Sequence, residues 1–378
     1  NNYSLASTAT YTLGVISSKT ITITGIIAQD KVYDGNNTAT IDTSGIDYEG
    51  LVAGENVTIA SSSGEFDNKN VGTGKTLSLT NTYAGSDLGN YTIVDQTTTT
   101  ASITAKTITA TLTGTISKPY DGDTSATLTA ANYLLYGFVS GESATITQTV
   151  GTYDTAAVGT AKEVTASLSG AYSPASGTDL SNYSLASTAT YTLGVISSKT
   201  ITITGIIAQD KVYDGNNTAT IDTSGIDYEG LVAGENVTIA SSSGEFDNKN
   251  VGTGKTLSLT NTYAGSDLGN YTIVDQTSAT ASITARPIVI TPNSGQSKTY
   301  EASDPLPFTY SLETAGVHRG LVVGDSFSGT LSRTAGESVG TYTITIGTLT
   351  NTNYSPTLAS EVFSINKKGL TISGVTAN

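Results

Sequence analysis

An exact internal duplication constrains the fold of this chain more than any other feature. The segment Asn2–Thr97 recurs, residue for residue, as Asn182–Thr277. The offset between the copies is too long for one turn of a solenoid, which predicts a shorter period inside it. Lys-Thr-Ile-Thr opens a unit at Lys19, Lys106 and Lys199, and Arg286-Pro-Ile-Val opens a fourth, divergent unit. The chain is therefore an array of repeats.

Four landmarks recur in the same order inside each unit. They are a Lys-x-Tyr-Asp-Gly turn, a Gly-Leu/Phe-Val-x-Gly-acid turn, a Val-Gly-Thr step and an Asn-Tyr pair. In order, they begin at Lys31, Gly50, Val71 and Asn90; at Lys118, Gly137, Val158 and Asn182; at Lys211, Gly230, Val251 and Asn270; and at Lys298, Gly320, Val339 and Asn353. The fourth unit reads Tyr300-Glu-Ala302 in place of Tyr-Asp-Gly.

The landmarks predict the domain boundaries. Residues 1–18 match the end of the second unit and are expected to be the tail of a preceding repeat. We expect repeat 1 at 19–105, repeat 2 at 106–198, repeat 3 at 199–285, repeat 4 at 286–367, and the start of a further repeat at 368–378.

Each unit is typical of β-structure. Apolar residues alternate with Thr or Ser in Thr20–Thr24, Val57–Ile59 and Leu77–Leu79, and turn residues separate such runs every 8–12 positions. About seven short strands in roughly 90 residues suit an immunoglobulin-like sandwich. Tyr91 and Tyr183, each preceded by an acidic and a small residue, suit a tyrosine corner, in which the hydroxyl bonds back to the backbone. We therefore predict tandem immunoglobulin-like β-sandwich domains, each with its own core, in an elongated rod. The alternative is a β-grasp-like repeat, for which the sequence offers no helix.

Composition excludes several classes of function. The chain has no Cys, so disulfides and thiolate metal sites are impossible. His318 is the single His, and without a second one neither a His-based catalytic relay nor a multi-His metal site can form. A net charge of −15 argues against nucleic acid as a partner, and no apolar run is long enough to insert in a membrane. We predict that the chain is not an enzyme.

The landmarks resemble those of known repeat domains. Asp30–Thr40, Gly50–Gly54, Lys69–Gly72 and Gly89–Thr92 resemble the YDG repeat domains of large bacterial surface proteins. The fourth unit, with Lys298–Pro305, Gly320–Asp325 and Ala335–Tyr342, resembles the related MBG domain. The resemblance implies an extracellular place on a bacterial cell surface, in an adhesin of the filamentous-haemagglutinin kind, with a role in adhesion or biofilm formation. It implies no particular ligand.

The Tyr-Asp-Gly turn is the strongest candidate for a ligand site. Its oxygen-bearing side chains could hold Ca²⁺; these are Asp34, Asn36 and Asn37 in repeat 1, Asp121 and Asp123 in repeat 2, and Asp214 and Asn216 in repeat 3. The competing interpretation is a tight turn in which Asp caps, Gly takes a positive φ and Tyr33 packs on the core. No other cofactor is expected.

Two covalent modifications are open alternatives. Nine Asn-x-Ser/Thr sequons, among them Asn182 and Asn353, could accept glycans. Lys31 and Asn90 could form an isopeptide bond between their side chains, as befits a domain under tension. Carboxylates such as Asp42 and Asp47 fall in loops and do not indicate catalysis.

Repetition favours a structural role. We predict a stalk or spacer, monomeric by itself, that projects a distal binding region located outside these residues. The alternative is that the repeats themselves bind a host glycan, mucin or matrix protein through weak, multivalent contacts.

Overall fold

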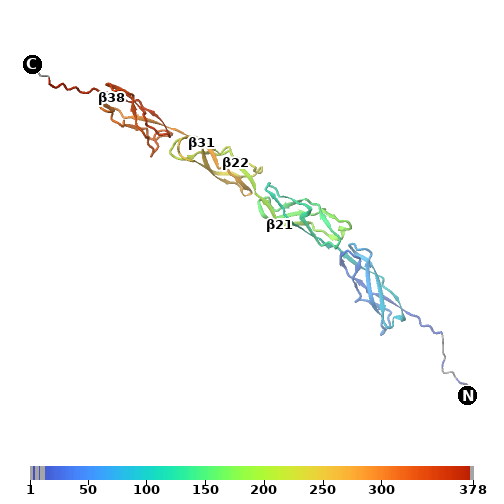
Figure 1. Cartoon of the computed structure of the whole chain (residues 1–378). Coiled ribbons are helices and arrows are strands. Elements are labelled where there is room, and N and C mark those ends of the chain that lie inside the picture. The colour runs from blue at the N-terminus through green and yellow to red at the C-terminus, as the bar shows by residue number, and fades with distance from the viewer. Residues whose placement is uncertain (1–2, 5–7, 9–12, 375–378) are drawn as a thin grey trace. The chain divides into compact units, whose positions relative to one another are not determined.

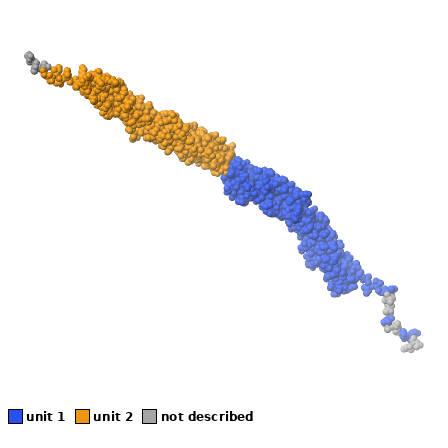
Figure 2. All heavy atoms as spheres, in the orientation of Figure 1, with its two compact units in different colours: residues 1–197 blue, residues 198–378 orange. Residues whose placement is uncertain are grey.

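The chain is built from β-strands. The computed structural model describes residues 3–4, 8 and 13–374, which fold into two compact units, residues 1–197 and 198–378 (Figures 1 and 2). Unit 1 holds repeats 1 and 2, and unit 2 holds repeats 3 and 4. The helices within the described residues are four short 3-10 turns: η1 (Leu88–Asn90), η2 (Ala130–Asn132), η3 (Leu180–Asn182) and η4 (Leu268–Asn270). The all-β prediction is confirmed, and the β-grasp alternative lacks its helix.

Repeats 1 and 3 are two-sheet domains with the same strands, as their identical sequences require. The strands of repeat 1 are β1 (Lys19–Thr24), β2 (Ile27–Ala28), β3 (Lys31–Val32), β4 (Thr38–Ala39), β5 (Ile41–Asp42), β6 (Asp47–Glu49), β7 (Thr58–Phe66), β8 (Gly72–Ala84), β9 (Tyr91–Val94) and β10 (Thr98–Thr104). Those of repeat 3 are β22 (Lys199–Thr204), β23 (Ile207–Ala208), β24 (Lys211–Val212), β25 (Thr218–Ala219), β26 (Ile221–Asp222), β27 (Asp227–Glu229), β28 (Thr238–Phe246), β29 (Gly252–Ala264), β30 (Tyr271–Val274) and β31 (Ser278–Thr284).

In repeat 1 the sheets have the orders β6-β1-β9 and β3-β10-β8-β7-β4, and β2 pairs with β5. Alternation sends Ile21 and Ile23 inward at 0% and 2% exposure, while the Thr residues between and beside them are less buried. Each sheet also contains one parallel pair, β1 with β9 and β3 with β10, whereas an immunoglobulin sandwich consists of antiparallel sheets.

Strand register places the landmarks at two opposite ends of the domain. Ile103 of β10 pairs with both Lys31 and Gly72, so the Tyr-Asp-Gly turn and the β7–β8 loop lie at one end. Lys19 of β1 pairs with Tyr91, and Thr22 pairs with Glu49, so the Gly50–Glu55 turn and η1 lie at the other end. We call these the donor end and the acceptor end, after the hydrogen bonds described below.

Repeats 2 and 4 vary this plan. The strands of repeat 2 are β11 (Lys106–Thr107), β12 (Thr109–Leu112), β13 (Ser117–Pro119), β14 (Ser125–Thr127), β15 (Tyr133–Tyr136), β16 (Ala144–Ile146), β17 (Val150–Tyr153), β18 (Gly159–Ser167), β19 (Tyr172–Pro174), β20 (Tyr183–Ser184) and β21 (Thr188–Ser197). Its main sheet has the order β13-β21-β18-β17-β14, and β11–β20, β12–β15 and β16–β19 form pairs.

Repeat 4 has two sheets, with the orders β34-β32-β37 and β33-β38-β36-β35. Its strands are β32 (Arg286–Pro292), β33 (Ser297–Thr299), β34 (Tyr310–Leu312), β35 (Ser332–Arg333), β36 (Gly340–Thr345), β37 (Tyr354–Leu358) and β38 (Val362–Asn366). Its core contains Phe308, Leu331 and Phe363.

The expectation that every repeat buries a separate core is wrong for unit 1. The apolar cluster of repeat 1 continues through Tyr33 to Ile108 and Tyr183 of repeat 2, with Phe138 and Val139 packed against it. Repeats 1 and 2 therefore share buried surface.

Candidate functional site: the junctions between repeats

The Tyr-Asp-Gly turn at the donor end is organised around a lysine. The Lys31 ammonium donates to the Asn36 and Thr38 carbonyls at 3.1 and 2.9 Å and to Asn36 Oδ1 at 2.9 Å, and it lies 2.7 Å from Asp34. Lys211 makes the same contacts in repeat 3. Partial burial raises the pKa of Asp34, but hydrogen bonds from Lys31 and the Asn36 amide outweigh it and leave the pKa below its ordinary value.

The side-chain oxygens of Asp34 and Asn36 are predicted Ca²⁺ ligands, and the ammonium group already binds them. The third predicted residue, Asn37, instead donates from its Nδ2 to the Phe66 carbonyl at 3.4 Å. In repeat 2, Lys118 lies 2.6 Å from both Asp121 and Asp123, and mainly because of the Lys118 hydrogen bond the pKa of Asp123 falls to about 2. Among the described residues, no group of three or more His, Cys, Asp or Glu side chains could hold a metal ion together. The calcium hypothesis remains a prediction in which the ion must displace a lysine.

A second lysine organises the β7–β8 loop beside that turn. Lys75 donates to the Asn68 and Asn70 carbonyls at 2.9 and 2.8 Å. Lys31 and Lys75 each lie 6.0 Å from the centre of the Phe66 ring. One buried aromatic ring therefore lies against the lysines that organise both loops of the donor end.

The acceptor end is organised around a tyrosine. In repeat 2, the Tyr183 hydroxyl accepts a hydrogen bond of 3.2 Å from the Val139 amide and donates one of 2.7 Å to Glu142. Tyr91 does the same with Val52 and Glu55 in repeat 1, as does Tyr354 with Val322 and Asp325 in repeat 4. The predicted bond from this tyrosine to the backbone is confirmed, and it ties the Asn-Tyr pair to the Gly-Leu/Phe-Val-x-Gly-acid turn.

In unit 1 the donor end of repeat 1 docks on the acceptor end of repeat 2. The Tyr33 hydroxyl donates to Glu142 Oε1 at 2.6 Å, and the Lys69 ammonium lies 3.1 Å from the same oxygen. The Tyr33 and Tyr183 rings meet edge to face with their centres 5.3 Å apart. The Glu142 carboxylate, whose side chain is 8% exposed, thus accepts from both tyrosines and the lysine.

Asn182 forms a second link across the same junction. Its Oδ1 accepts the Val71 amide at 2.8 Å, and its Nδ2 donates to Asn70 Oδ1 at 3.2 Å. The residue is 0% exposed. A glycan on the Asn182 sequon is incompatible with this packing, because the side-chain nitrogen that would carry it is buried.

The electrostatics of the junction favour a charged Glu142. Burial raises the pKa of this carboxyl, but hydrogen bonds from Tyr33, Tyr183 and Lys69 together lower the pKa below its ordinary value. Burial and then the hydrogen bond to Glu142 raise the pKa of Tyr183 to about 12. Both pKa shifts mean that the folded junction favours a neutral Tyr183 phenol that donates to a charged Glu142 carboxylate.

Unit 2 contains the same junction with two substitutions. Tyr213 and Tyr354 donate to Asp325 at 2.9 and 2.6 Å, and Asn353 accepts the Val251 amide at 3.0 Å. Aspartate is one methylene shorter than glutamate, and the Lys249 ammonium lies 3.8 Å from the Asp325 carboxylate. The first residue of the repeat, Arg286, is buried at 6% exposure and donates to the carbonyls of Tyr213, Gly320, Gly316 and Arg319. Arginine thereby adds a direct link to the preceding repeat.

Other predicted sites are not assembled. Lys31 lies at the donor end and Asn90 at the acceptor end of repeat 1, so the proposed isopeptide bond between them is ruled out by strand register. His318 is exposed in a loop with a φ of 56°. Asp42 caps its own turn by accepting the Ser44 amide at 2.8 Å. None of the helices within the described part of the chain is long and apolar enough to cross a membrane.

Comparison with known sequences identifies these repeats. The YDG domain matches residues 17–100, 104–191 and 197–280, and the MBG domain (YGX type) matches residues 288–364. The chain belongs to the YDG domain family. The predicted resemblance is confirmed, and the Tyr-Asp-Gly signature of a YDG repeat contributes the tyrosine that crosses the described junctions.

Solved structures similar to these YDG repeats share little sequence with them. The extracellular domain of protocadherin gammaB4 is 9% identical over 92% of this chain and 67% of its own, with a TM-score of 0.27. Drosophila N-cadherin EC1-4 is 10% identical over 91% of this chain and 100% of its own, with a TM-score of 0.23. No curated protein matches the chain.

Proposed function

We propose that the chain is a stalk segment of an exported bacterial surface adhesin, in which YDG and MBG repeats hold a distal binding region away from the cell. One observation carries the proposal. The same junction joins repeat 1 to repeat 2 and repeat 3 to repeat 4, through a shared carboxylate and an asparagine that accepts a backbone amide of the preceding repeat. A spacer needs joints that resist bending, and at these two junctions hydrogen bonds made by two separate loops supply that resistance.

The charge distribution supports an extracellular, surface-attached role. The net charge of −15 keeps the chain soluble and repels it from an anionic cell surface. At the described junctions, ion pairing is local to Lys69 with Glu142 and Lys249 with Asp325. Because these pairs are partly buried, salt screens them less than it screens exposed charges.

Small-angle X-ray scattering on the whole chain tests the spacer role. Four compact domains of this size placed end to end span about 130–180 Å. We expect a maximum dimension in that range, and a more flexible scattering profile for a variant that carries both Glu142→Ala and Asn182→Ala. A compact particle, or a profile unchanged by the two substitutions, would contradict the proposal.

A binding assay separates a spacer from an adhesive repeat. We expect the whole chain to give no signal on a glycan array or with immobilised mucin. Saturable binding that survives competition with salt would instead assign adhesion to the repeats themselves. The expectation that the chain is not an enzyme remains a prediction.

A further inference from the structure

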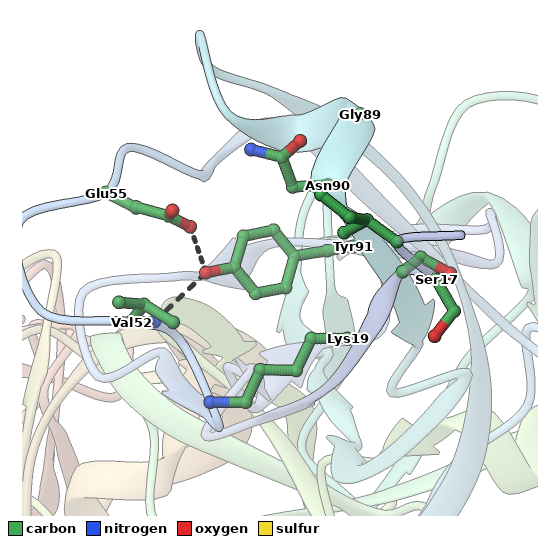
Figure 3. A pocket seen from close by; sticks show the side chains of 9 residues that line it. Ser17, Lys19, Val52, Glu55, Gly89, Asn90 and Tyr91 are labelled. Carbon is green, nitrogen blue, oxygen red and sulfur yellow. Dashed lines mark hydrogen bonds between the residues drawn. The ribbon is translucent and has the colours of Figure 1, made fainter. Parts of the chain in front are cut away.

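The acceptor end of repeat 1 presents the groups that bind a donor end elsewhere in the chain. Val52, Glu55, Asn90 and Tyr91 line an open pocket with Ser17 and Lys19, and the Tyr91 hydroxyl bonds both Glu55 and the Val52 amide (Figure 3). We call Val52, Glu55, Asn90 and Tyr91 the acceptor face. They occupy the positions of Val139, Glu142, Asn182 and Tyr183 in repeat 2. Asn182 is 0% exposed in its junction, whereas Asn90 is exposed and Val52 is 43% exposed.

The segment that leads into this pocket identifies what belongs there. Residues 2–18 are identical to residues 182–198, which supply the last residue of η3 and the strands β20 and β21 of repeat 2. Ile196 in β21 is 1% exposed, whereas its counterpart Ile16 is 100% exposed. Tyr183 is 6% exposed, whereas its counterpart Tyr3 is 98% exposed. The same side chains are buried when residues 106–181 accompany them, so this segment has the sequence of the last strands of a repeat like repeat 2.

We propose that the acceptor face of repeat 1 binds the donor end of a YDG repeat that precedes it in the same polypeptide and ends with residues 2–18. The preceding repeat's Tyr-Asp-Gly tyrosine donates to Glu55, its Val-Gly-Thr valine amide donates to Asn90, and its Tyr-Asp-Gly glycine packs on Val52. The inference goes beyond the proposed spacer role and does not depend on it, because the surface would dock a repeat whether or not the array also binds a ligand.

Both described junctions contain these three contacts. Tyr33 and Tyr213 reach the carboxylate, and Val71 and Val251 reach the asparagine. A Cβ atom on Gly35 or Gly215 would lie 2.8 Å from Cγ1 of the facing valine, Val139 or Val322. Only glycine therefore lets the turn approach the valine this closely.

A repeat like repeat 2 retains the tyrosine, the glycine and the valine that make these contacts, but it has no counterpart of Lys69. It carries Tyr120, Gly122 and Val158, while Ala156 and Ala157 replace the residues that align with Lys69 and Asn70. The proposed docking therefore lacks a lysine to pair with Glu55. We expect it to weaken less at high salt than the junction of unit 1, in which Lys69 pairs with Glu142.

Disulfide trapping in an extended chain tests the proposal, because the native chain has no Cys. Residues 106–181 are placed directly before residue 2 of the whole chain, which completes a repeat ahead of repeat 1. A Cβ on Gly35 would lie 3.8 Å from Val139 Cβ, which is the usual Cβ separation in a disulfide. The test pair is Gly122→Cys in the added copy with Val52→Cys, and the positive control is Gly35→Cys with Val139→Cys.

We expect the test pair to form an intramolecular disulfide to about the same extent as the control pair. A control that crosslinks while the test pair does not would overturn the proposal. Crosslinks between molecules in place of intramolecular ones would also overturn it, because the occupant would then be another chain.

Hydroxyl-radical footprinting of the extended chain without cysteines gives a second, independent measurement. This measurement tests the docking even if the positive φ at Gly122 or Gly35 prevents a cysteine variant from folding. We expect oxidation of Val52 to fall severalfold relative to the 378-residue chain, while Val32 at the donor end, which is 55% exposed, keeps its reactivity. Equal oxidation of Val52 in both chains would overturn the proposal.

Discussion

The Tyr33 hydroxyl donates a 2.6 Å hydrogen bond to Glu142, a residue 109 positions further along the chain and in the next repeat. This contact explains the structural role of each residue of the Tyr-Asp-Gly turn. Lys31 binds the turn's oxygens, the turn's glycine allows close approach to Val139, and the tyrosine reaches the carboxylate. The motif is therefore a connector between domains.

Neutralising Glu142 should weaken the junction of unit 1. Glu142→Gln removes the charge that accepts hydrogen bonds from Tyr33, Tyr183 and Lys69. Because hydrogen bonds to a charged group contribute more than neutral ones, we expect the free energy of unfolding of unit 1 to fall by about 2 kcal/mol. Calorimetry of the whole chain measures the loss, with unit 2 as the internal reference.

The matched control for this substitution is Glu163→Gln. Glu163 is an exposed residue on β18 of the same repeat. We expect its substitution to leave the melting of unit 1 within experimental error. If Glu142→Gln were equally silent, the carboxylate would not be what holds the repeats together.

Removing Asn182 should expose one backbone amide. Asn182→Ala deprives the Val71 N–H of its acceptor at 2.8 Å, and an amide left unpaired at this part-buried position costs at most about 3 kcal/mol. We expect hydrogen exchange at Val71 to accelerate by an order of magnitude or more, while the Val251 amide in unit 2 is unaffected. Asn353→Ala should reverse this pattern, because Asn353 accepts the Val251 amide. Acceleration at both valines in either variant would contradict a local link.

Sequence patterns were sufficient to predict the fold class, because each half-buried strand shows a two-residue alternation of apolar and polar residues. The alternation around Ile21 and Ile23 predicts strand and inward direction together, and both are buried. The parallel pairing of β1 with β9 was not predictable, since it joins Lys19 to Tyr91 across most of a domain. Periodicity within a strand carries no information about its neighbour.

The function of the landmarks was harder to predict than their existence. The sequence shows that Tyr33, Glu142 and Asn182 recur, but not that residues of one repeat complete the core of the next. Tyr33 was expected to pack on the core, and it does so at 1% exposure. Its hydroxyl bonds to a neighbouring domain, however, and no pattern within a single repeat could show that. The available signal was that two pairs of landmarks recur together in the repeats. The Tyr-Asp-Gly tyrosine recurs with the acidic residue, and the Val-Gly-Thr valine recurs with the asparagine.

The junction of unit 1 should loosen in acid. The folded-state pKa of Glu142 lies below its ordinary value of 4.5. A depressed carboxyl pKa contributes stability above the unfolded-state value and loses it as pH falls through the folded-state value. We expect the melting difference between the native chain and Glu142→Gln to be constant near neutral pH and to shrink below about pH 4.5. A difference that persists at the lowest pH at which unit 1 stays folded would show that the lost charge is not responsible.

Calcium should leave the native chain unchanged. Lys31, Lys118 and Lys211 occupy the oxygen clusters that a calcium ion would need. We expect isothermal titration with Ca²⁺ to give no saturable heat, and melting to be the same with Ca²⁺ or with a chelator. Lys118→Met is the informative variant, since it leaves the Asp121 and Asp123 carboxylates without their cation. A saturable response of the native chain would mean that calcium displaces the ammonium and that the turn is a metal site after all.

Adding one methyl group to the Tyr-Asp-Gly turn should separate backbone strain from interdomain contact. Gly35 has a φ of 86°, and a Cβ atom there would lie 2.8 Å from Val139 Cγ1; Gly54 has a φ of 95° with nothing within 4 Å. A left-handed conformation costs an alanine roughly 1–2 kcal/mol at either position. Overpacking adds about 1–3 kcal/mol at Gly35 alone.

Gly35→Ala should therefore destabilise unit 1 more than Gly54→Ala does, and the excess should disappear when Val139→Ala is introduced with it. Denaturant unfolding of the four variants measures each step as a double-substitution cycle. An excess that remains after Val139 is truncated would place the cost inside repeat 1. Its disappearance would locate the cost in the contact between the turn of one repeat and the valine of the next, where the glycine of the signature is required.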